Sequence, residues 1–197
     1  MKSVKQVSKR TDPFIRRELL IDATARCLAQ YGAQGVSVRA ICKEAGVTPG
    51  LLRHYFDGID DCIAEAYRAT GNRVEKALLL AVAAAPQEPR PRLLAYLTAS
   101  FAPPISDAEL LATWLAFWAL TKTDPRIADL HAQIYGAYRR NLEILIGDYR
   151  PGDHRLTAVA LTALVDGLWL ELSLGNAPFS RDEAGLLVEK WLGALLP

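Results

Sequence analysis

Several features that mark other classes of protein are missing from this sequence of 197 residues. It has only three cysteines, Cys27, Cys42 and Cys62, an odd number without the spacing of a metal site. Its three histidines stand in separate segments, so we expect no bound metal and no cofactor. No GxxxxGK phosphate loop and no local grouping of nucleophile, base and acid occurs. These absences give no support to a metal, nucleotide or nucleophilic active site.

Long hydrophobic runs are also missing. The most apolar stretches are Ala77–Ala85, Leu110–Leu120 and Leu156–Leu170, and all are shorter than the roughly 20 apolar residues that cross a bilayer. Met1–Arg10 is polar and basic, without the apolar centre of a signal peptide. The sequence therefore predicts a protein without a membrane partner. The sparse cysteines suit a reducing cytoplasm, where we expect the protein to be located.

The net charge of +1 conceals an uneven distribution along the chain. Residues 1–56 contain ten lysines and arginines against four acids, whereas the remainder contains thirteen against eighteen. A basic front end on an acidic body indicates a polyanionic partner for the front end only.

Apolar residues recur at helical spacing throughout the chain, and no segment alternates apolar and polar residues long enough to predict a strand. Proline and glycine breaks divide the chain into about nine helices. The first expected helix is Pro13–Tyr31, with a stop at Gly32. Two short helices follow, one capped by Ser37 and ended by Gly46, the other capped by Thr48 and running to Tyr55. A long helix then runs from Ile59 to the proline-rich linker Pro86–Pro91, and the remaining helices are Arg92–Ala102, Asp107–Lys122, Pro125–Tyr149, Asp153–Leu174 and Arg181–Leu196. The predicted fold class is all-α.

The segment from Ser37 to Phe56 contains the most informative pattern. Two short helices flank a tight turn at Gly46-Val47, and the second helix carries Arg53, His54 and Tyr55. This arrangement is typical of a helix-turn-helix, whose second helix enters the DNA major groove. A plain helical hairpin is the alternative. The basic N-terminal arm, Met1–Arg10, the capped short helices and the polar second helix together favour DNA binding.

Residues 14–67 resemble the DNA-binding domain of TetR-family transcriptional regulators, on the strings S-V-R-A-I-C-K-E-A-G-V and T-P-G-L-L-R-H-Y-F. The resemblance implies a bacterial, ligand-responsive repressor with a three-helix DNA-binding domain at 1–58 and an effector-binding and dimerisation domain at 59–197. It also implies double-stranded DNA as the partner and a set of residues at or near that DNA. This set is Arg39, Thr48, Pro49, Gly50, Arg53, His54 and Tyr55. One departure is Ile59, where the family commonly has a lysine that meets a phosphate.

Four aromatic residues and one acid in the second half could form an effector site. Trp114 and Trp118 are neighbours on one helix face, Phe117 lies between them in sequence, and Asp166 lies one turn before Trp169. Aromatic faces with a nearby carboxylate suit a quaternary amine. Two segments, Thr113–Ala119 and Leu164–Leu170, resemble betaine-pathway repressors of the BetI type, which respond to choline. Ordinary core packing of the tryptophans is the alternative.

The last two predicted helices carry apolar stripes that could close a monomer's core or pair two copies of the chain. Ala160, Ala163 and Gly167 are small enough for close helix approach. A homodimer would also place its two DNA-contacting helices, one from each helix-turn-helix, about 34–36 Å apart, which is one turn of DNA. We therefore predict a homodimer through the last two helices.

A rival hypothesis comes from a different class of function. The aromatic residues could line the pocket of a small helical enzyme or of a lipid or small-molecule carrier, with the basic arm incidental. Duplex binding that weakens steeply with salt would favour the regulator.

Overall fold

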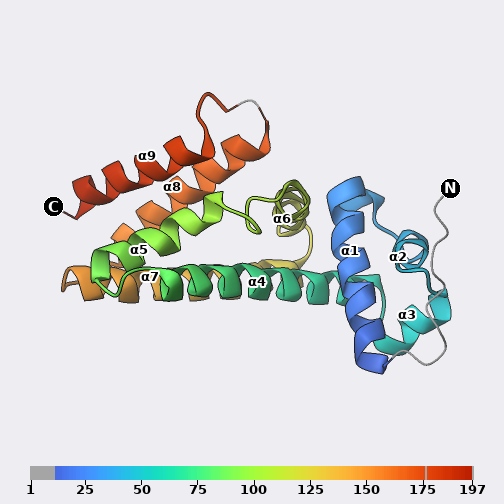
Figure 1. Cartoon of the computed structure of the whole chain (residues 1–197). Helices are drawn as coiled ribbons and strands as arrows, with labels where there is room; N and C mark the ends of the chain where they lie inside the picture. Colours follow the sequence, from blue (N-terminus) through green and yellow to red (C-terminus); the bar gives the residue numbers. More distant parts are fainter. Residues whose placement is uncertain (1–11, 176, 197) are drawn as a thin grey trace. The chain divides into compact units, whose positions relative to one another are not determined.

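The computed structural model describes residues 12–175 and 177–196, and every regular element within these ranges is helical (Figure 1). The elements are α1 Pro13–Gly35, α2 Val38–Ala45, α3 Pro49–Tyr55, α4 Ile59–Ala84, α5 Pro89–Thr98, a 3-10 turn Ala99–Phe101, α6 Ala108–Leu120, α7 Pro125–Tyr149, α8 Arg155–Ser173 and α9 Arg181–Leu195. The all-α prediction is confirmed. The basic residues before Asp12, on which the predicted arm depends, lie outside the described residues.

The chain forms two compact units that each combine separate stretches of sequence. Unit 1 comprises the described residues up to Thr70 together with Ala112–His131. Unit 2 comprises Gly71–Leu111 together with the described residues after His131. The end of α6 and the first turns of α7 therefore belong to the same unit as the N-terminal helices.

Local sequence sets the helix ends of unit 1. The Asp12 side chain accepts a hydrogen bond from the Phe14 amide at 2.9 Å, and the Ser37 hydroxyl accepts one from the Ala40 amide at 3.2 Å. The expected stop at Gly32 is a kink instead, with a φ of 65°, and α1 continues to Gly35. Gly46 has a φ of 67°, a left-handed backbone that glycine adopts without steric cost. Gly46 thereby ends α2 and turns the chain into α3 (Figure 1).

The core of unit 1 lies between α1, α2, α3 and the first half of α4. Its fully or almost fully buried members are Leu20, Ala23, Leu28, Ile41, Cys42, Leu52, Phe56, Cys62 and Tyr67. Not every apolar residue of α1 faces this core, because Ile15 and Tyr31 are exposed whereas Leu20 and Ile21 are buried.

Two other expectations about local structure need correction. Thr48 has the extended backbone of an N-cap, but its side chain makes no capping hydrogen bond. Pro89 and Pro91 were expected in a linker, yet they lie in the first turn of α5. Proline is tolerated there because the first amides of a helix have no intrahelical acceptor.

Unit 2 is built on the mutual packing of α5, α8 and α9 (Figure 1). Its centre consists of small and branched apolar side chains, namely Leu93, Leu97, Ala158, Leu161, Val165, Ala184, Val188 and Leu192. A capping box between Ser180 and Glu183 starts α9. The ion pair between Arg90 and Glu189, at 3.0 Å, adds a polar link between α5 and α9.

Helix α8 is long and apolar enough to cross a membrane by length and composition alone. One such helix is weak evidence for a span, because core helices pass the same test. Here α8 packs against α5 and α9 and buries Ala158, Leu161 and Val165. It therefore serves as a core helix of unit 2.

Candidate nucleic-acid interface

The helix-turn-helix expected between Ser37 and Phe56 is present in unit 1. Helix α2 packs on α1 and on α3, and the Val47 amide donates to the Cys42 carbonyl at 2.9 Å across the turn. Helix α3 buries Leu52 completely and leaves Arg53 and His54 exposed. The imidazole of His54 meets the Tyr55 ring edge to face, with centroids 4.9 Å apart. The polar side of α3 is therefore open to a partner.

The seven residues predicted to contact DNA lie on or next to this exposed surface. Arg39 is exposed on α2, Thr48, Pro49 and Gly50 are exposed at the start of α3, and Tyr55 is half-buried at its end. Gly50 has no positive φ, and a Cβ built on it would meet only the Thr48 hydroxyl, at 4.0 Å. Neither the backbone nor the packing of unit 1 therefore requires glycine at this position.

Some arginines of unit 1 form ion pairs with acids, and others do not. The paired arginines include Arg17, Arg26, Arg68 and Arg126. Arg39 and Arg53 form no ion pair within the described part of the chain, and Lys43 on α2 is likewise exposed. These three exposed cations lie on α2 and α3, where they are available to phosphates or base edges.

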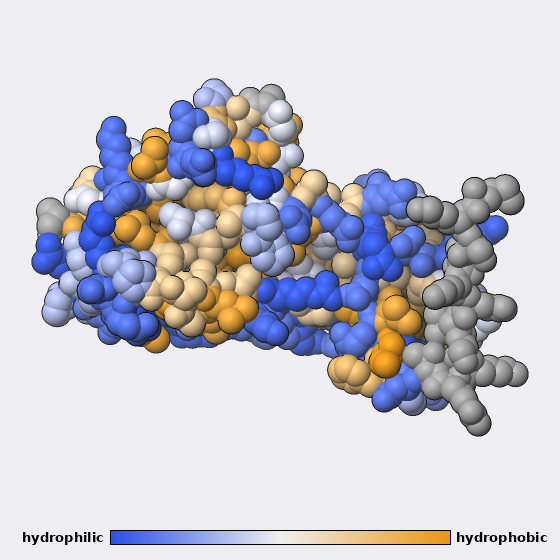
Figure 2. All heavy atoms as spheres, viewed as in Figure 1, coloured by the Kyte–Doolittle hydropathy of each residue, from blue (hydrophilic) through white to orange (hydrophobic). Residues whose placement is uncertain are grey.

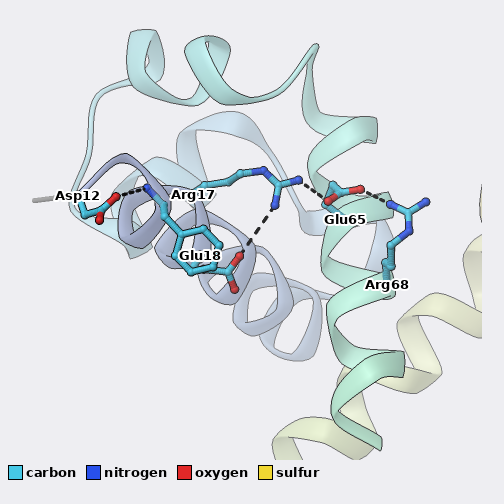
Figure 3. A network of polar contacts seen from close by, with 6 residues as sticks. Asp12, Arg17, Glu18, Glu65 and Arg68 are labelled. Carbon is cyan, nitrogen blue, oxygen red and sulfur yellow. Dashed lines mark hydrogen bonds and ion pairs between the residues drawn. The ribbon is translucent and has the colours of Figure 1, made fainter. Parts of the chain in front are cut away.

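A polar network holds α1, the end of α3 and α4 together. Figure 3 shows Arg17 reaching from α1 to Glu65 on α4, with Arg68 on the other side of the same carboxylate. The Arg17 guanidinium also lies over the Phe56 ring, 5.2 Å from its centroid, directly after α3. Because one side chain contacts three elements, it fixes the end of α3 relative to α1 and α4. Sequence reasoning missed this network, since Arg17 and Glu65 are 48 residues apart.

Helix α4 begins at Ile59, where the resemblance implies a lysine, and its first turn then carries Asp60 and Asp61. Ile59 is half-buried and cannot contact a phosphate through a charge. The Asp61 carboxylate accepts a hydrogen bond from the Asp57 amide at 3.1 Å, and Asp60 pairs with Arg126 on α7 at 3.3 Å. Arg126 therefore offsets the negative charge of Asp60, whereas Asp61 keeps its charge and is held by a neutral amide.

Tyr67 is the centre of an aromatic cluster in unit 1 that the sequence did not reveal. Its ring, 0% exposed, stacks on Phe117 with centroids 4.2 Å apart and meets the edge of Trp114 at 5.5 Å. Its hydroxyl hydrogen-bonds His131 Nδ1 at 2.8 Å. The Thr113 hydroxyl donates to the Ala25 carbonyl at 3.1 Å, which ties α6 to α1. The ends of α6 and α7 are therefore bound to the helices that carry the candidate interface.

The five side chains predicted as an effector cage are divided between the two units. Trp114, Phe117 and Trp118 belong to unit 1, where Phe117 and Trp114 pack on Tyr67. Asp166 and Trp169 belong to unit 2. Burial raises the pKa of the Asp166 carboxyl to about 6, although the Tyr135 hydroxyl and the Arg139 charge act in the opposite direction.

The three cysteines are buried and form no disulfide. Burial raises the pKa of each thiol, that of Cys62 to about 11. They pack as small hydrophobic groups. Among the described residues, no group of three or more His, Cys, Asp or Glu is placed to hold a metal ion.

Comparison with known proteins identifies the family of the chain. Residues 20–66 match the model of bacterial regulatory proteins of the tetR family, and residues 89–197 match that of the BetI-type transcriptional repressor C-terminal domain. The HTH-type transcriptional regulator BetI of Burkholderia thailandensis is 32% identical over 92% of this chain and 94% of its own length. The chain belongs to the TetR family, with a BetI-type C-terminal domain. This TetR-family protein is a DNA-binding transcriptional regulator, and the enzyme or carrier hypothesis is set aside.

Solved structures agree with the TetR-family assignment. A candidate transcriptional regulator from Pseudomonas aeruginosa PAO1 is 41% identical, with a TM-score of 0.88 over 97% of this chain and 96% of that one. A candidate regulator from Saccharomonospora viridis, solved with choline, has a TM-score of 0.80 over 91% of this chain and 96% of that one. At 20% identity, the second likeness concerns the fold alone.

Proposed function

We propose that this regulator is a ligand-responsive repressor that binds a palindromic operator as a homodimer. The observation that supports the DNA-binding surface is that Arg39 and Lys43 on α2 and Arg53 on α3 are exposed. They form no ion pair within the described part of the chain, whereas Arg17, Arg26 and Arg126 pair with acids. Repression then follows from occupancy of the operator. As a DNA-binding regulator, the protein would act in the cytoplasm.

The seven candidate DNA contacts divide by their chemistry. Arg53, His54 and Tyr55 carry the groups that read base edges in the major groove. Arg39 on α2 and Thr48 beside α3 supply polar groups for the sugar-phosphate backbone, which position the protein without reading sequence. Pro49 and Gly50 are compact, so that the backbone of DNA can approach the start of α3 closely. Ile59 removes one further backbone contact.

The exposed face of α8 supports dimerisation. Leu156, Val159 and Leu174 are 68%, 40% and 61% exposed, and Ala163 and Gly167 are exposed between them. These positions recur at helical spacing on one side of α8, opposite the buried side that packs in unit 2. Trp191 and Leu195 of α9 add further exposed apolar surface. Figure 2 shows apolar atoms among polar ones on the visible surface of unit 2, at the left of the view.

The effector is proposed to be a small organic cation of the quaternary-amine class. Its support is the BetI-type C-terminal match and the choline in the Saccharomonospora viridis structure, together with the candidate ligand residues. Asp166 and Trp169 are the candidate ligand residues of unit 2, whereas Trp114, Phe117 and Trp118 belong to unit 1. A dimer whose two α3 helices are wrongly spaced for successive major grooves does not fit the operator. A ligand that binds this geometry more tightly than the DNA-binding geometry releases the operator, to an extent set by the ratio of its two affinities. The long helix α4, shared by both units, would transmit the change.

Selection of bound fragments from a random duplex pool tests the proposed function directly. We expect the full chain to enrich a palindrome, with binding that weakens steeply as salt rises. A palindrome reports sequence specificity and two-fold symmetry in one measurement. Enrichment of no sequence, or of a site without symmetry, would contradict the dimeric operator-binding mode.

Arg53→Ala should weaken binding to the selected palindrome by about 1–3 kcal/mol and relax the sequence preference at one position per half-site. The physical reason is that a single exposed guanidinium on α3 supplies two parallel hydrogen bonds to a base edge. Fluorescence anisotropy with the palindrome and single-base variants measures both effects. Arg140→Ala, which removes an exposed cation from unit 2, is the matched control. Equal binding by all three proteins would remove Arg53 from the interface.

Gly50→Ala should leave the folded protein as stable as the parent, or raise its stability by up to about 1 kcal/mol, because alanine favours helix. The same substitution should lower operator affinity roughly tenfold, or about 1.4 kcal/mol, since the new methyl group stands where the DNA backbone approaches. Urea unfolding and operator titration separate the two effects. Gly147→Ala on α7, where a Cβ meets nothing within 4 Å, controls for the helix effect. Unchanged operator affinity would show that DNA does not approach this glycine.

A further inference from the structure

Helix α3 presents the exposed Arg53 and His54, yet it has only seven residues. It packs along α2, and the completely buried Leu52 anchors its centre in the core of unit 1. Phe56 ends the helix in an extended conformation, and its side chain is buried. A helix this short is not stable by itself, so its direction depends on the contacts that hold each end.

The Arg17 guanidinium holds the end of α3. It lies over the Phe56 ring, 5.2 Å from its centroid, and its Nη2 donates to Glu65 Oε2 on α4. A guanidinium can make both contacts at once, because its flat face meets an aromatic ring while its in-plane N–H groups meet a carboxylate. The Asp61 carboxylate of α4 accepts a hydrogen bond from the Asp57 amide at 3.1 Å and so holds the following turn. The end of α3 is therefore attached to α4 through Arg17 and Asp61.

The charges around Arg17 make it unsuited to a direct phosphate contact. Figure 3 shows its guanidinium linked to two carboxylates, those of Glu65 and, at 3.9 Å, of Glu18. Arg68 pairs with the second oxygen of Glu65, so these four residues together carry no net charge. A cation neutralised in this way attracts phosphate much less than the exposed cations of α2 and α3 do. Any effect of Arg17 on DNA binding must then come from the position that it gives α3.

We propose that Arg17 is a positioning residue for operator recognition. Held by Glu65, its guanidinium sets the direction in which α3 leaves the core and enters the major groove. Arg17 acts through the Phe56 ring and makes no contact with DNA itself. The inference rests on the proposed function in taking α3 as the helix that reads base edges.

A small change in the direction of α3 should affect specific and non-specific binding differently. Hydrogen bonds to base edges require a narrow range of distance and angle, whereas the attraction of cations to phosphates tolerates displacement. Losing the contact between Arg17 and Phe56 should therefore weaken binding to the operator more than binding to an arbitrary duplex.

Amide hydrogen exchange of the full chain without DNA tests whether Arg17 holds α3. Arg17→Lys keeps the positive charge but replaces the flat, forked guanidinium with a compact ammonium. We expect it to speed exchange of the α3 amides, including the Phe56 amide that donates to the Leu52 carbonyl, at least about tenfold. Exchange in α5, α8 and α9 of unit 2 should stay as in the parent. Unchanged exchange in α3 would overturn the proposal, whatever the DNA measurements show.

Two duplexes then separate positioning from a direct contact. One is the palindrome selected by the parent chain, and the other is a shuffled duplex of the same length and composition. Arg17→Lys and Glu65→Gln should each lower affinity for the palindrome about tenfold and change affinity for the shuffled duplex by less than about twofold. A direct phosphate contact predicts the opposite for Glu65→Gln, because removing this carboxylate would free two arginines and raise affinity for both duplexes.

Arg26→Lys is the matched control. Arg26 is also on α1, but its ion pair, at 2.7 Å, joins α1 to Glu44 of α2. This variant should match the parent in exchange of α3 and in affinity for both duplexes. Combining Arg17→Lys with Glu65→Gln should lower affinity for the palindrome no further than either change alone, because the two residues act as one unit. Fully additive losses, or equal losses on both duplexes, would contradict the positioning role. Urea unfolding of each variant confirms that it is folded.

The inference and the proposed function can fail separately, because exchange uses no DNA and the selection uses only the parent chain. Faster exchange in α3 of Arg17→Lys, with no palindrome enriched by the parent, would uphold the hold of Arg17 on α3 and reject the operator-binding mode. An enriched palindrome that Arg17→Lys and Glu65→Gln bind as tightly as the parent does would keep the operator and reject the inference.

Discussion

Replacing Tyr67 with alanine is expected to lower the free energy of unfolding by about 3–5 kcal/mol, the usual range for a buried aromatic residue. Tyr67 is completely buried in unit 1, stacks on Phe117, meets Trp114 edge to face and hydrogen-bonds His131. Removing its ring would leave a cavity where α4, α6 and α7 meet. Urea unfolding, followed by tryptophan fluorescence, measures the loss.

Tyr67→Phe is the matched variant for this prediction. It keeps the ring contacts and removes only the 2.8 Å hydrogen bond to His131, so the loss should be about 1 kcal/mol. The difference between the two variants then measures the packing of the ring. If Tyr67→Ala unfolds at the same urea concentration as the parent, the aromatic cluster does not stabilise unit 1.

Replacing Gly167 with arginine is expected to produce a monomer that no longer binds the palindromic operator. A Cβ at this position meets nothing within 4 Å in the single chain, so the substitution creates no clash inside unit 2. Arginine also favours helix over glycine by about 1 kcal/mol, which should keep α8 folded. In the proposed dimer, however, a long charged side chain would stand between two closely packed helices.

Size-exclusion chromatography with light scattering measures the mass of this variant, and anisotropy measures its operator affinity. Gly147→Arg on α7 introduces the same side chain at another position where a Cβ meets nothing within 4 Å, and it should remain dimeric. A dimer of Gly167→Arg would contradict the proposal that α8 forms the interface. A parent protein that is itself monomeric at operator-binding concentrations would contradict the dimer altogether.

The two expected results concern different levels of the same mechanism. Tyr67 stabilises the unit that carries α2 and α3, so its loss should reduce the folded fraction. Gly167 leaves each chain folded and affects only the pairing of two chains. Measuring stability and mass for both variants therefore separates a loss of folded protein from a loss of pairing between folded chains.

Much of the fold was predictable because helix ends depend on local chemistry. Ser37 caps α2 through its side chain, Gly46 ends it in a left-handed conformation, and Pro49 starts α3. These signals act within a few residues, so a single sequence contains them. The surface of α3 was predictable for the same reason. Once Leu52 is assigned to the core, helical spacing places Arg53 and His54 on an exposed side.

The proposed effector site was less predictable, because it depends on which helices lie against one another. Periodicity groups Trp114 with Trp118 on one helix, but it does not show that the neighbouring Trp114 and Phe117 pack on Tyr67 of α4. Nor does it show that Asp166 receives a hydrogen bond from Tyr135, 31 residues earlier. The contacts of Tyr135 with Asp166 and with Arg139 were therefore missed, although Tyr135 and Arg139 stand at i, i+4.

The sequence by itself determined the helices, most of their ends and the polar surface of the second short helix, because each follows from interactions along a few turns of chain. Tertiary structure alone decided that Arg17 joins Glu65 and Phe56, that the ends of α6 and α7 belong with the N-terminal helices, and that Tyr135 joins Arg139 to Asp166. The physical reason is that one helix offers several faces of similar character. Only the packing of the whole unit selects which face meets which neighbour.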